Sequence, residues 1–224
     1  MTGRIEALSA LDWWREAGVD TLVDEEPRDW LRAPPKPEII AAAMPVADAL
    51  PATLASFHVW WRETGALPGA PASRLTPSGD PASGLMLLAD MPDAADALFS
   101  GELGRLFDRM LGAIGRDRAS IYLAAMAGVR VAVRGLEDET LVRAAKHHVA
   151  LAAPRLLLLL GEAPSRAILG LGFAEARGRI HEFNHDGATV RAIATFHPRF
   201  LLQRPALKAA AWADLRMLIG ELGG

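Results

Sequence analysis

Two stretches of the chain place a side chain suited to acid–base chemistry at the end of an apolar strand. The run Val190 to Ala194 is followed by Thr-Phe and then by His197 and Pro198, and the run Leu85 to Ala89 is followed by Asp90. The carboxyl ends of parallel strands meet at one edge of an open α/β sheet, where such folds bind their ligands. We therefore expect Asp90 and His197 to face one cleft.

Each of these stretches also has a structural interpretation. Pro198 opens a helix directly after His197, so backbone N–H groups without intrahelical partners lie beside the imidazole. The run Asp90-Met-Pro-Asp93 has the composition of a helix start, with Asp90 as the N-cap and Pro92 at the first helical position. Taken alone, the helix start is the favoured interpretation of that run. Its pairing with His197 strengthens the functional interpretation.

The elements that would position these residues alternate between strand and helix. Buried strands are expected over 85–89, 120–124, 156–160 and 190–194, and helices over 103–114, 138–153, 165–169 and 205–222. Strands unbroken by polar residues are typical of a parallel sheet covered on both faces. We therefore expect an α/β fold, a three-layer α/β/α arrangement around a central, mostly parallel four-stranded sheet. A hairpin around Asp186-Gly187 should lead into the last strand.

The first third of the chain has a different character. Residues 4–17 have apolar positions at helical spacing, three prolines fall within 32–37, and 38–63 is expected to be an interrupted helix. Residues 67–84 are rich in Pro, Gly, Ser and Ala, which is typical of a long surface connection. We divide the chain into a helical, Trp- and Pro-rich arm over 1–83 and an α/β domain over 84–224, together forming one compact unit.

The composition excludes several kinds of chemistry. None of the 224 residues is cysteine. This excludes disulfides, thiolate nucleophiles and zinc or iron–sulfur centres held by cysteine. The net charge of −3 does not draw the whole molecule to nucleic acid, so a site for a polyanion would be a local patch. No apolar run approaches the roughly 18 residues of a membrane span, and the N-terminus lacks a signal-peptide pattern. We expect a cytoplasmic protein without a metal or cofactor.

Other candidate motifs have simpler interpretations. Gly161-Glu-Ala-Pro-Ser165 follows a strand, but it has no lysine and lacks the glycine spacing of a phosphate loop, so a structural turn is favoured. His181 and His185 are four residues apart, and on a strand this spacing is roughly 13 Å, too far to share one metal ion. His58 lies on an apolar helix face and is expected to be a hydrogen-bonded core residue.

Several segments resemble the uracil-DNA glycosylase superfamily, and among its members the iron–sulfur type, family 4. The resemblance extends roughly from Gly84 to Leu222 in consistent order. Its strongest part is the stretch from Thr195 to Leu215, with His-Pro, Leu-Leu, Arg-Pro and Trp-x-Asp-Leu in register. The other matching segments are Leu98 to Leu111, Ile114 to Tyr122, Pro154 to Gly161, Ala167 to Gly170 and Arg177 to His181.

The resemblance implies roles for individual residues. Members of the family flip a base out of DNA and hydrolyse its glycosidic bond. By position, His197 would stabilise the oxygen of the leaving base, Asp90 would replace the acidic residue of the first motif, and Phe99 would stack on the base. Pro92 retains the proline of that motif and is assigned to substrate binding. Pro198, Arg199 and Arg204, in the His-Pro turn and its flank, are expected to contact DNA.

The chain also departs from the family pattern. The first motif, Gly-Glu-Ala-Pro-Gly in the family, reads Ala89-Asp-Met-Pro-Asp93. Ala125 stands where the family has an asparagine that reads the base, so discrimination between bases should be weakened. The cluster cysteines are missing, with Val129 at one of their positions, so no iron–sulfur cluster is expected. Packing must replace its structural role, and the tryptophan-rich first third could supply it.

These observations lead to two functional expectations of different classes. One is a uracil-DNA glycosylase-like protein of base-excision repair that binds single- or double-stranded DNA, with reduced or altered activity. The other is a catalytically inactive module of the same fold that binds DNA or a protein partner. A hydrolase acting on something other than nucleic acid is a third option without positive support.

Overall fold

A computed structural model describes residues 50–185 and 187–223. The described residues all belong to one compact unit. The expected helix over 4–17, the proline-rich 32–37 and the first part of the helix expected over 38–63 lie outside the described residues. The division into an arm over 1–83 and a domain over 84–224 therefore remains a prediction.

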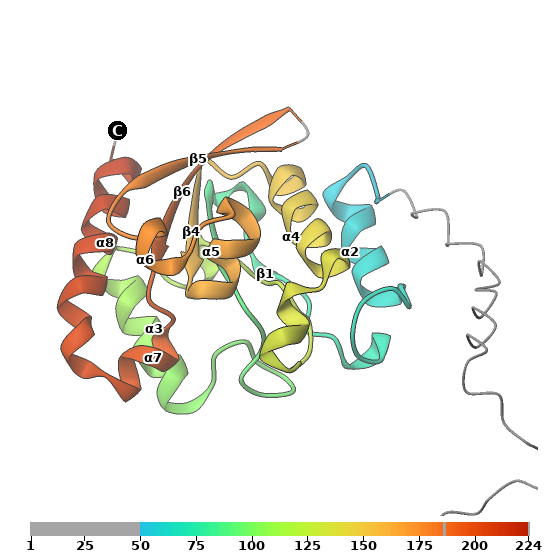
Figure 1. Cartoon of the computed structure of the whole chain (residues 1–224), viewed down its shortest axis with the longest axis horizontal. Helices are drawn as coiled ribbons and strands as arrows, with labels where there is room; N and C mark the ends of the chain where they lie inside the picture. Colours follow the sequence, from blue (N-terminus) through green and yellow to red (C-terminus); the bar gives the residue numbers. More distant parts are fainter. Residues whose placement is uncertain (1–49, 186, 224) are drawn as a thin grey trace, which may run out of the picture. The chain divides into compact units, whose positions relative to one another are not determined.

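The described residues form one sheet of six strands in the order β1-β3-β2-β4-β6-β5. Figure 1 shows its β6 and β5 edge in orange. The four central strands, β3, β2, β4 and β6, are parallel, which confirms the expected sheet. The edge strands β1 and β5 pair antiparallel and extend it to six. The strands are β1 (Ser78–Gly79), β2 (Leu85–Ala89), β3 (Tyr122–Ala125), β4 (Leu156–Leu160), β5 (Ile180–His185) and β6 (Ala188–Thr195).

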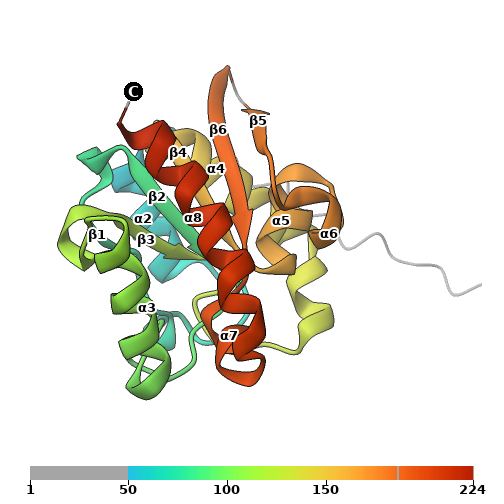
Figure 2. The ribbon, with the colours of Figure 1, turned by 90° about the vertical axis from the view of Figure 1, so that its left-hand side faces the viewer.

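Helices cover both faces of the sheet and confirm the three layers (Figure 2). Because successive strand residues point to opposite faces, Leu85 and Leu87 pack toward α3 and α8, whereas Met86 and Leu88 pack toward α4 and α5. The helices are α2 (Leu54–Glu63), α3 (Gly101–Ala113), α4 (Glu139–Ala152), α5 (Glu162–Leu169), α6 (Phe173–Ala176), α7 (Pro198–Gln203) and α8 (Lys208–Leu222). In the described part of the chain, no helix is long and apolar enough to cross a membrane.

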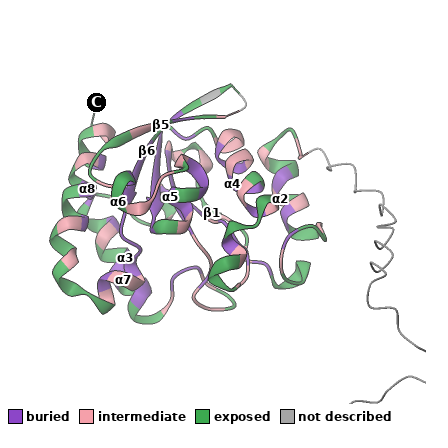
Figure 3. Cartoon of the chain, in the orientation of Figure 1, coloured by how far each residue is buried: buried purple, intermediate pink, exposed green. Residues whose placement is uncertain are grey.

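Burial follows the apolar strands, as Figure 3 shows in purple. All five leucines of β4 are at most 2% exposed. Full burial of one leucine side chain contributes about 1.5–3 kcal/mol, so this strand is a main source of stability. The strand register also sets the functional edge, because Ala89 lies opposite Ala125 and Leu160 lies opposite Thr195.

Strands β5 and β6 pair antiparallel, which confirms the expected hairpin; Asp186, in its expected turn, lies outside the described residues. Gly187 has a φ of +81°, a backbone conformation that glycine adopts readily. His181 and His185 lie on β5, and His181 contacts the carbonyl oxygen of Ala176 through Nε2 at 2.9 Å. No group of three His, Cys, Asp or Glu side chains among the described residues is placed to hold a metal ion.

The segment expected to be a surface connection contains a buried arginine. Arg74 is 6% exposed, and its guanidinium donates five hydrogen bonds to backbone carbonyl oxygens of the last turn of α2 and the loop that follows it. The acceptors, at 2.5–3.1 Å, are Trp61, Thr64, Leu67, Pro68 and Gly69. Five donors in a rigid fork are the full capacity of an arginine side chain. Arg74 therefore fixes the path of the chain between α2 and the sheet.

A small hydrophobic cluster lies beside Arg74. Phe57 and Trp61 of α2 pack with Leu136, Leu141 and other residues of the segment after β3. Val129, which the resemblance places at a cluster-cysteine position, packs against Gly69, where an added Cβ would come within 2.6 Å of the valine. Apolar packing that includes Trp60 and Trp61 occupies this region. Trp13, Trp14 and Trp30 are outside the described residues, so the structural role expected of the tryptophan-rich first third stays a prediction.

A second buried polar group connects α2, β3 and α4. The Tyr122 hydroxyl lies 2.6 Å from Nε2 of His58 and 2.7 Å from Nε2 of His148, so one imidazole donates to the hydroxyl and the other accepts from it. His58 is thus hydrogen-bonded, as expected, although it is half-buried and not a core residue. Burial lowers the pKa of His148 to about 3, with smaller contributions from the neighbouring His58 and His147.

The buried His148 should make the free energy of unfolding depend on pH. Below the ordinary histidine pKa near 6.5, the unfolded chain binds a proton that the folded chain does not bind until pH is about 3. The free energy of unfolding should therefore fall with decreasing pH in this window, by up to about 1.4 kcal/mol per pH unit from this residue. Urea unfolding at a series of pH values measures this slope. The variant His148→Gln should have a shallower slope, and an equal slope would contradict the assignment.

Candidate active site

His197 lies two residues beyond the end of β6 and caps the beginning of α7. Its Nδ1 accepts a hydrogen bond from the backbone N–H of Arg199 at 3.0 Å, and Pro198 occupies the first helical position, as expected. Because Nδ1 is an acceptor, the proton of the neutral ring is on Nε2. The residue is 8% exposed, and Nε2 has no hydrogen-bond partner among the described residues.

The surroundings of His197 favour its neutral form. Burial lowers its pKa to about 4; the carboxylates Asp90 and Asp93 act in the opposite direction, and Arg199 reinforces the lowering. At neutral pH the ring is therefore an uncharged N–H donor. A buried donor without a partner is costly, by about 1–3 kcal/mol, and such groups concentrate at functional sites.

Asp90 faces His197 across the edge of the sheet, which places both predicted residues together. Its Oδ1 lies 3.4 Å from Nε2 of His197, a contact too poorly aligned to be a hydrogen bond, and its Oδ2 lies 3.7 Å from a guanidinium nitrogen of Arg199. The expected helix start at Asp90 is wrong. Asp90 accepts from the N–H of Met91 in an irregular loop, and the next helix, α3, begins only at Gly101.

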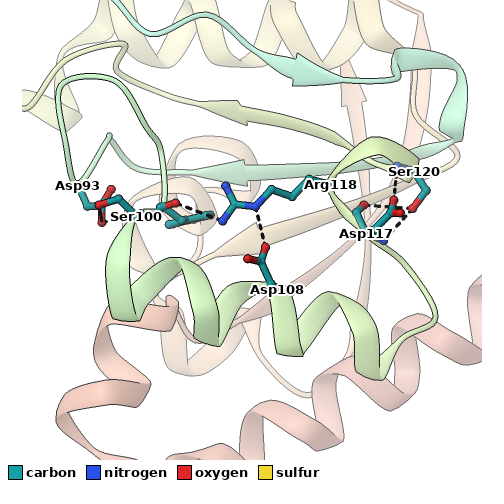
Figure 4. Close-up of polar contacts among 7 residues, drawn as sticks. Asp93, Ser100, Asp108, Asp117, Arg118 and Ser120 are labelled. Carbon is teal, nitrogen blue, oxygen red and sulfur yellow. Dashed lines mark hydrogen bonds and ion pairs between the residues drawn. The ribbon is translucent and has the colours of Figure 1, made fainter.

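Phe99 is the third predicted residue in this group. Its ring centroid lies 5.4 Å from that of His197, edge to face, and 4.4 Å from that of Phe107 in α3. Arg118 holds the backbone here, because it donates to the carbonyl oxygen of Phe99 and forms an ion pair with Asp108 (Figure 4). Phe99 is only 2% exposed, so its ring is packed within the core, and its stacking on a base remains a prediction.

Gly161 allows the end of β4 to approach His197. A Cβ added to this glycine would lie 3.2 Å from Cβ of His197, and its φ of +96° is also unfavourable for other residues. Gly161 is the N-cap of α5, so the Gly-Glu-Ala-Pro run is a structural turn, as expected. Its N–H donates to the carbonyl oxygen of Thr195, two residues before His197.

A buried ion pair fixes the strand end that carries His197. Asp214 of α8 is 1% exposed and accepts hydrogen bonds from Thr195 Oγ1 and from the guanidinium of Arg177, at 2.8–2.9 Å. Arg177 also stacks over the ring of Phe196 at 4.0 Å. The two residues before His197 are thus held by side chains from two other segments. Asp214 belongs to the Trp-x-Asp-Leu motif, but its role was not predicted.

The remaining predicted residues lie around this group. Pro92 is buried in the loop after β2. Arg204, at the end of α7, is exposed and stacks on Phe200 at 5.1 Å. Ala125 ends β3 and is half-buried beside a cavity of about 270 Å³ that Leu98 and Arg118 also line. With a methyl side chain, Ala125 offers no hydrogen bond to a ligand.

A parallel sheet with helices on both faces and polar residues at its carboxyl edge defines the doubly wound α/β class of proteins. Comparison with known families narrows this class. The family model described as "Uracil DNA glycosylase superfamily" matches residues 76–216, more than half of the chain, and the chain belongs to this superfamily. The match confirms the resemblance inferred from the His-Pro stretch.

The chain is also similar, at low sequence identity, to two proteins named as type-4 uracil-DNA glycosylases. The chain is 23% identical over 156 residues to a type-4 uracil-DNA glycosylase of Pyrobaculum aerophilum, which covers 63% of this chain and 80% of the relative. It is 27% identical over 136 residues to a type-4 uracil-DNA glycosylase of Archaeoglobus fulgidus, covering 56% of this chain and 68% of the relative.

Proposed function

We propose that the protein binds DNA, flips a damaged base out of the strand and hydrolyses its N-glycosidic bond. The observation that carries this proposal is the buried, uncharged His197, whose Nε2–H has no partner among the described residues and lies beside a carboxylate. The superfamily and its type-4 uracil-DNA glycosylases supply the substrate class.

In this proposal His197 stabilises the leaving base. When the glycosidic bond breaks, its electron pair goes to the base, and negative charge develops on a carbonyl oxygen. A neutral N–H donor fixed toward that oxygen stabilises the charge without having to reorganise. The bond from the N–H of Arg199 to Nδ1 fixes both the tautomer and the ring orientation.

Asp90 acts on the other product of the cleavage. The sugar becomes oxocarbenium-like as the base leaves, and a nearby carboxylate stabilises this positive charge. The same carboxylate can orient a water molecule that adds to C1′ and whose released proton balances the charge of the base anion.

The test is single-turnover incubation with single- and double-stranded oligonucleotides that contain uracil or another damaged base. Alkaline treatment cleaves the strand at each abasic site, and the products are resolved by length. Strand cleavage at the damaged position, from protein free of other glycosylases, is the expected result. The proposal is contradicted if every substrate remains intact.

The second candidate is a catalytically inactive module that binds DNA or a protein partner. The observation in its favour is Ala125, which cannot read a base where the family has an asparagine. Three aspartates, Asp90, Asp93 and Asp96, also lie in the loop after β2, where they oppose the approach of a phosphate backbone. Tight binding without strand cleavage across the substrate panel would favour this candidate.

If DNA binds at this edge, Arg199 and Arg204 should contact phosphates. Replacing both with alanine should weaken binding and reduce the slope of log K against log salt concentration by about 1.4–1.8, since each phosphate contact contributes roughly 0.7–0.9. Fluorescence anisotropy at several salt concentrations measures this slope. The control is the double variant of Arg116 and Arg155, which precede β3 and β4 at the opposite edge of the sheet. An unchanged slope in the Arg199 and Arg204 variant would rule out these contacts.

A further inference from the structure

Two buried polar atoms lack hydrogen-bond partners among the described residues, and both belong to the site. One is the donor Nε2 of His197, and the other is the acceptor Oδ1 of Asp93. Asp93 stands where the first motif of the family has a glycine, so its carboxylate is an addition rather than a replacement. Asp93 is also close enough to His197 to act on its charge, because its carboxylate favours the protonated form of the imidazole.

The surrounding contacts hold Asp93 in one orientation. Its Oδ2 accepts from both the N–H and the hydroxyl of Ser100, at 3.0 and 2.9 Å, as shown in Figure 4. Ser100 follows Phe99, whose ring packs edge to face on His197. Arg130, from the segment after β3, donates to the backbone carbonyl oxygen of Asp93 at 2.9 Å. The carboxylate is therefore fixed beside Phe99, with Oδ2 occupied and Oδ1 available.

An available acceptor and an available donor match a ligand that presents N–H and C=O side by side. We infer that Asp93 reads the N–H of a flipped base while His197 donates to the adjacent carbonyl oxygen, so that the site selects bases with a lactam edge. This inference rests on the proposed function. It assigns to Asp93 the base-reading role that Ala125 cannot fill.

The selected class contains uracil, with N3–H between two carbonyl groups, and hypoxanthine, with N1–H beside O6. Cytosine and adenine present an unprotonated ring nitrogen at the corresponding position. This nitrogen is a hydrogen-bond acceptor and would face the carboxylate oxygen of Asp93, which is also an acceptor, so the two would repel each other. A site built to accept a hydrogen bond rejects the analogue that lacks the donor, since its own polar group is then left unpaired. Thymine has the same N3–H as uracil, so Asp93 does not distinguish these two bases.

The variant Asp93→Asn tests this inference because it should invert the preference. The backbone N–H of Ser100 can only donate, so it keeps the amide oxygen of the new side chain in the position of Oδ2. The amide NH₂ then occupies the position of Oδ1 and becomes a donor. A donor at this position matches N3 of cytosine and opposes N3–H of uracil.

Binding is measured with oligonucleotides whose target nucleotide carries a 2′-fluoro group, which disfavours the oxocarbenium-like sugar and so prevents cleavage. The target bases are uracil, thymine, cytosine and N3-methyluracil. The wild type should bind uracil about 10- to 100-fold more tightly than cytosine or N3-methyluracil, the effect of one hydrogen bond to a charged group. In Asp93→Asn the ratio of uracil to cytosine affinity should fall by at least about tenfold.

Two comparisons make the result specific. The ratio of uracil to thymine affinity should be unchanged in Asp93→Asn. The control variant Asp96→Asn removes one negative charge from an exposed residue of the same loop, and it should behave as the wild type. If the wild type binds these probes and Asp93→Asn leaves the uracil-to-cytosine ratio unchanged, Asp93 does not read the base, although the proposed function stands. If the wild type binds no probe and cleaves no substrate, both the inference and the proposed function are wrong.

Discussion

Replacing His197 with alanine should reduce the single-turnover rate of base excision by about 10²- to 10³-fold, the cost of losing one preorganised donor to a developing negative charge. The ring contributes its Nε2–H as a neutral donor, because Nδ1 is occupied by the backbone N–H of Arg199. Binding to an uncleavable uracil oligonucleotide should change much less, since the interaction strengthens in the transition state. The measurement is strand cleavage at saturating protein.

The pH dependence provides an independent check of the neutral ring. With a pKa of about 4, His197 stays uncharged from pH 8 to pH 5, so its protonation should not slow excision in this range. As pH falls through about 4 the ring gains a proton on Nδ1 and loses its bond to the N–H of Arg199. A rate that increases with protonation near pH 6.5 would instead indicate a charged imidazole. His197→Gln, which retains an N–H donor, should keep more activity than His197→Ala.

The second large effect is expected on stability. Arg74→Met should lower the free energy of unfolding by about 3–5 kcal/mol, the range for removing one side of a buried charged interaction. The methionine fills part of the volume but leaves five backbone carbonyl oxygens without their donors. Urea unfolding monitored by tryptophan fluorescence measures the change, with Trp61 lying directly in the affected region.

Two further variants isolate the cause of this loss. Arg74→Lys keeps the charge but supplies at most three donors from a single atom, so it should recover only part of the stability. Arg62→Met removes an exposed arginine from α2 and should change stability by no more than about 0.5 kcal/mol. Equal stability of Arg74→Met and the wild type would show that the carbonyl oxygens find other donors.

The sequence was sufficient for the part of the fold that depends on apolar periodicity and turn chemistry. The leucine runs of β2 and β4 are too apolar for any position but the centre of a sheet, and Gly187 marks the hairpin before β6. Because parallel strands end at a common edge, the same pattern was enough to bring Asp90 and His197 together. The edge strand β1 has only two residues and leaves no periodic signal.

Side chains whose role depends on distant backbone were not predictable in this way. Arg74 lies in a Pro- and Gly-rich segment, and the carbonyl groups that it binds converge only after α2 has packed on the core. In the sequence Asp93 has the pattern of a degenerate motif position, because its relation to Ser100 depends on the irregular path of residues 91–100. Asp214 had the spacing of a conventional amphipathic helix, which does not indicate its contact with Thr195.

The anchoring of Thr195 by Asp214 has a consequence for the order of events during protein synthesis. His197 leaves the ribosome before α8 does, yet the strand end that carries it is held by a side chain of that later helix. A nascent chain that stops before Asp214 has the full sheet sequence but lacks the partner of Thr195 and Arg177. The strand end before His197 thus gains this anchor only when α8 docks, so the final positioning of the site is coupled to the packing of that helix.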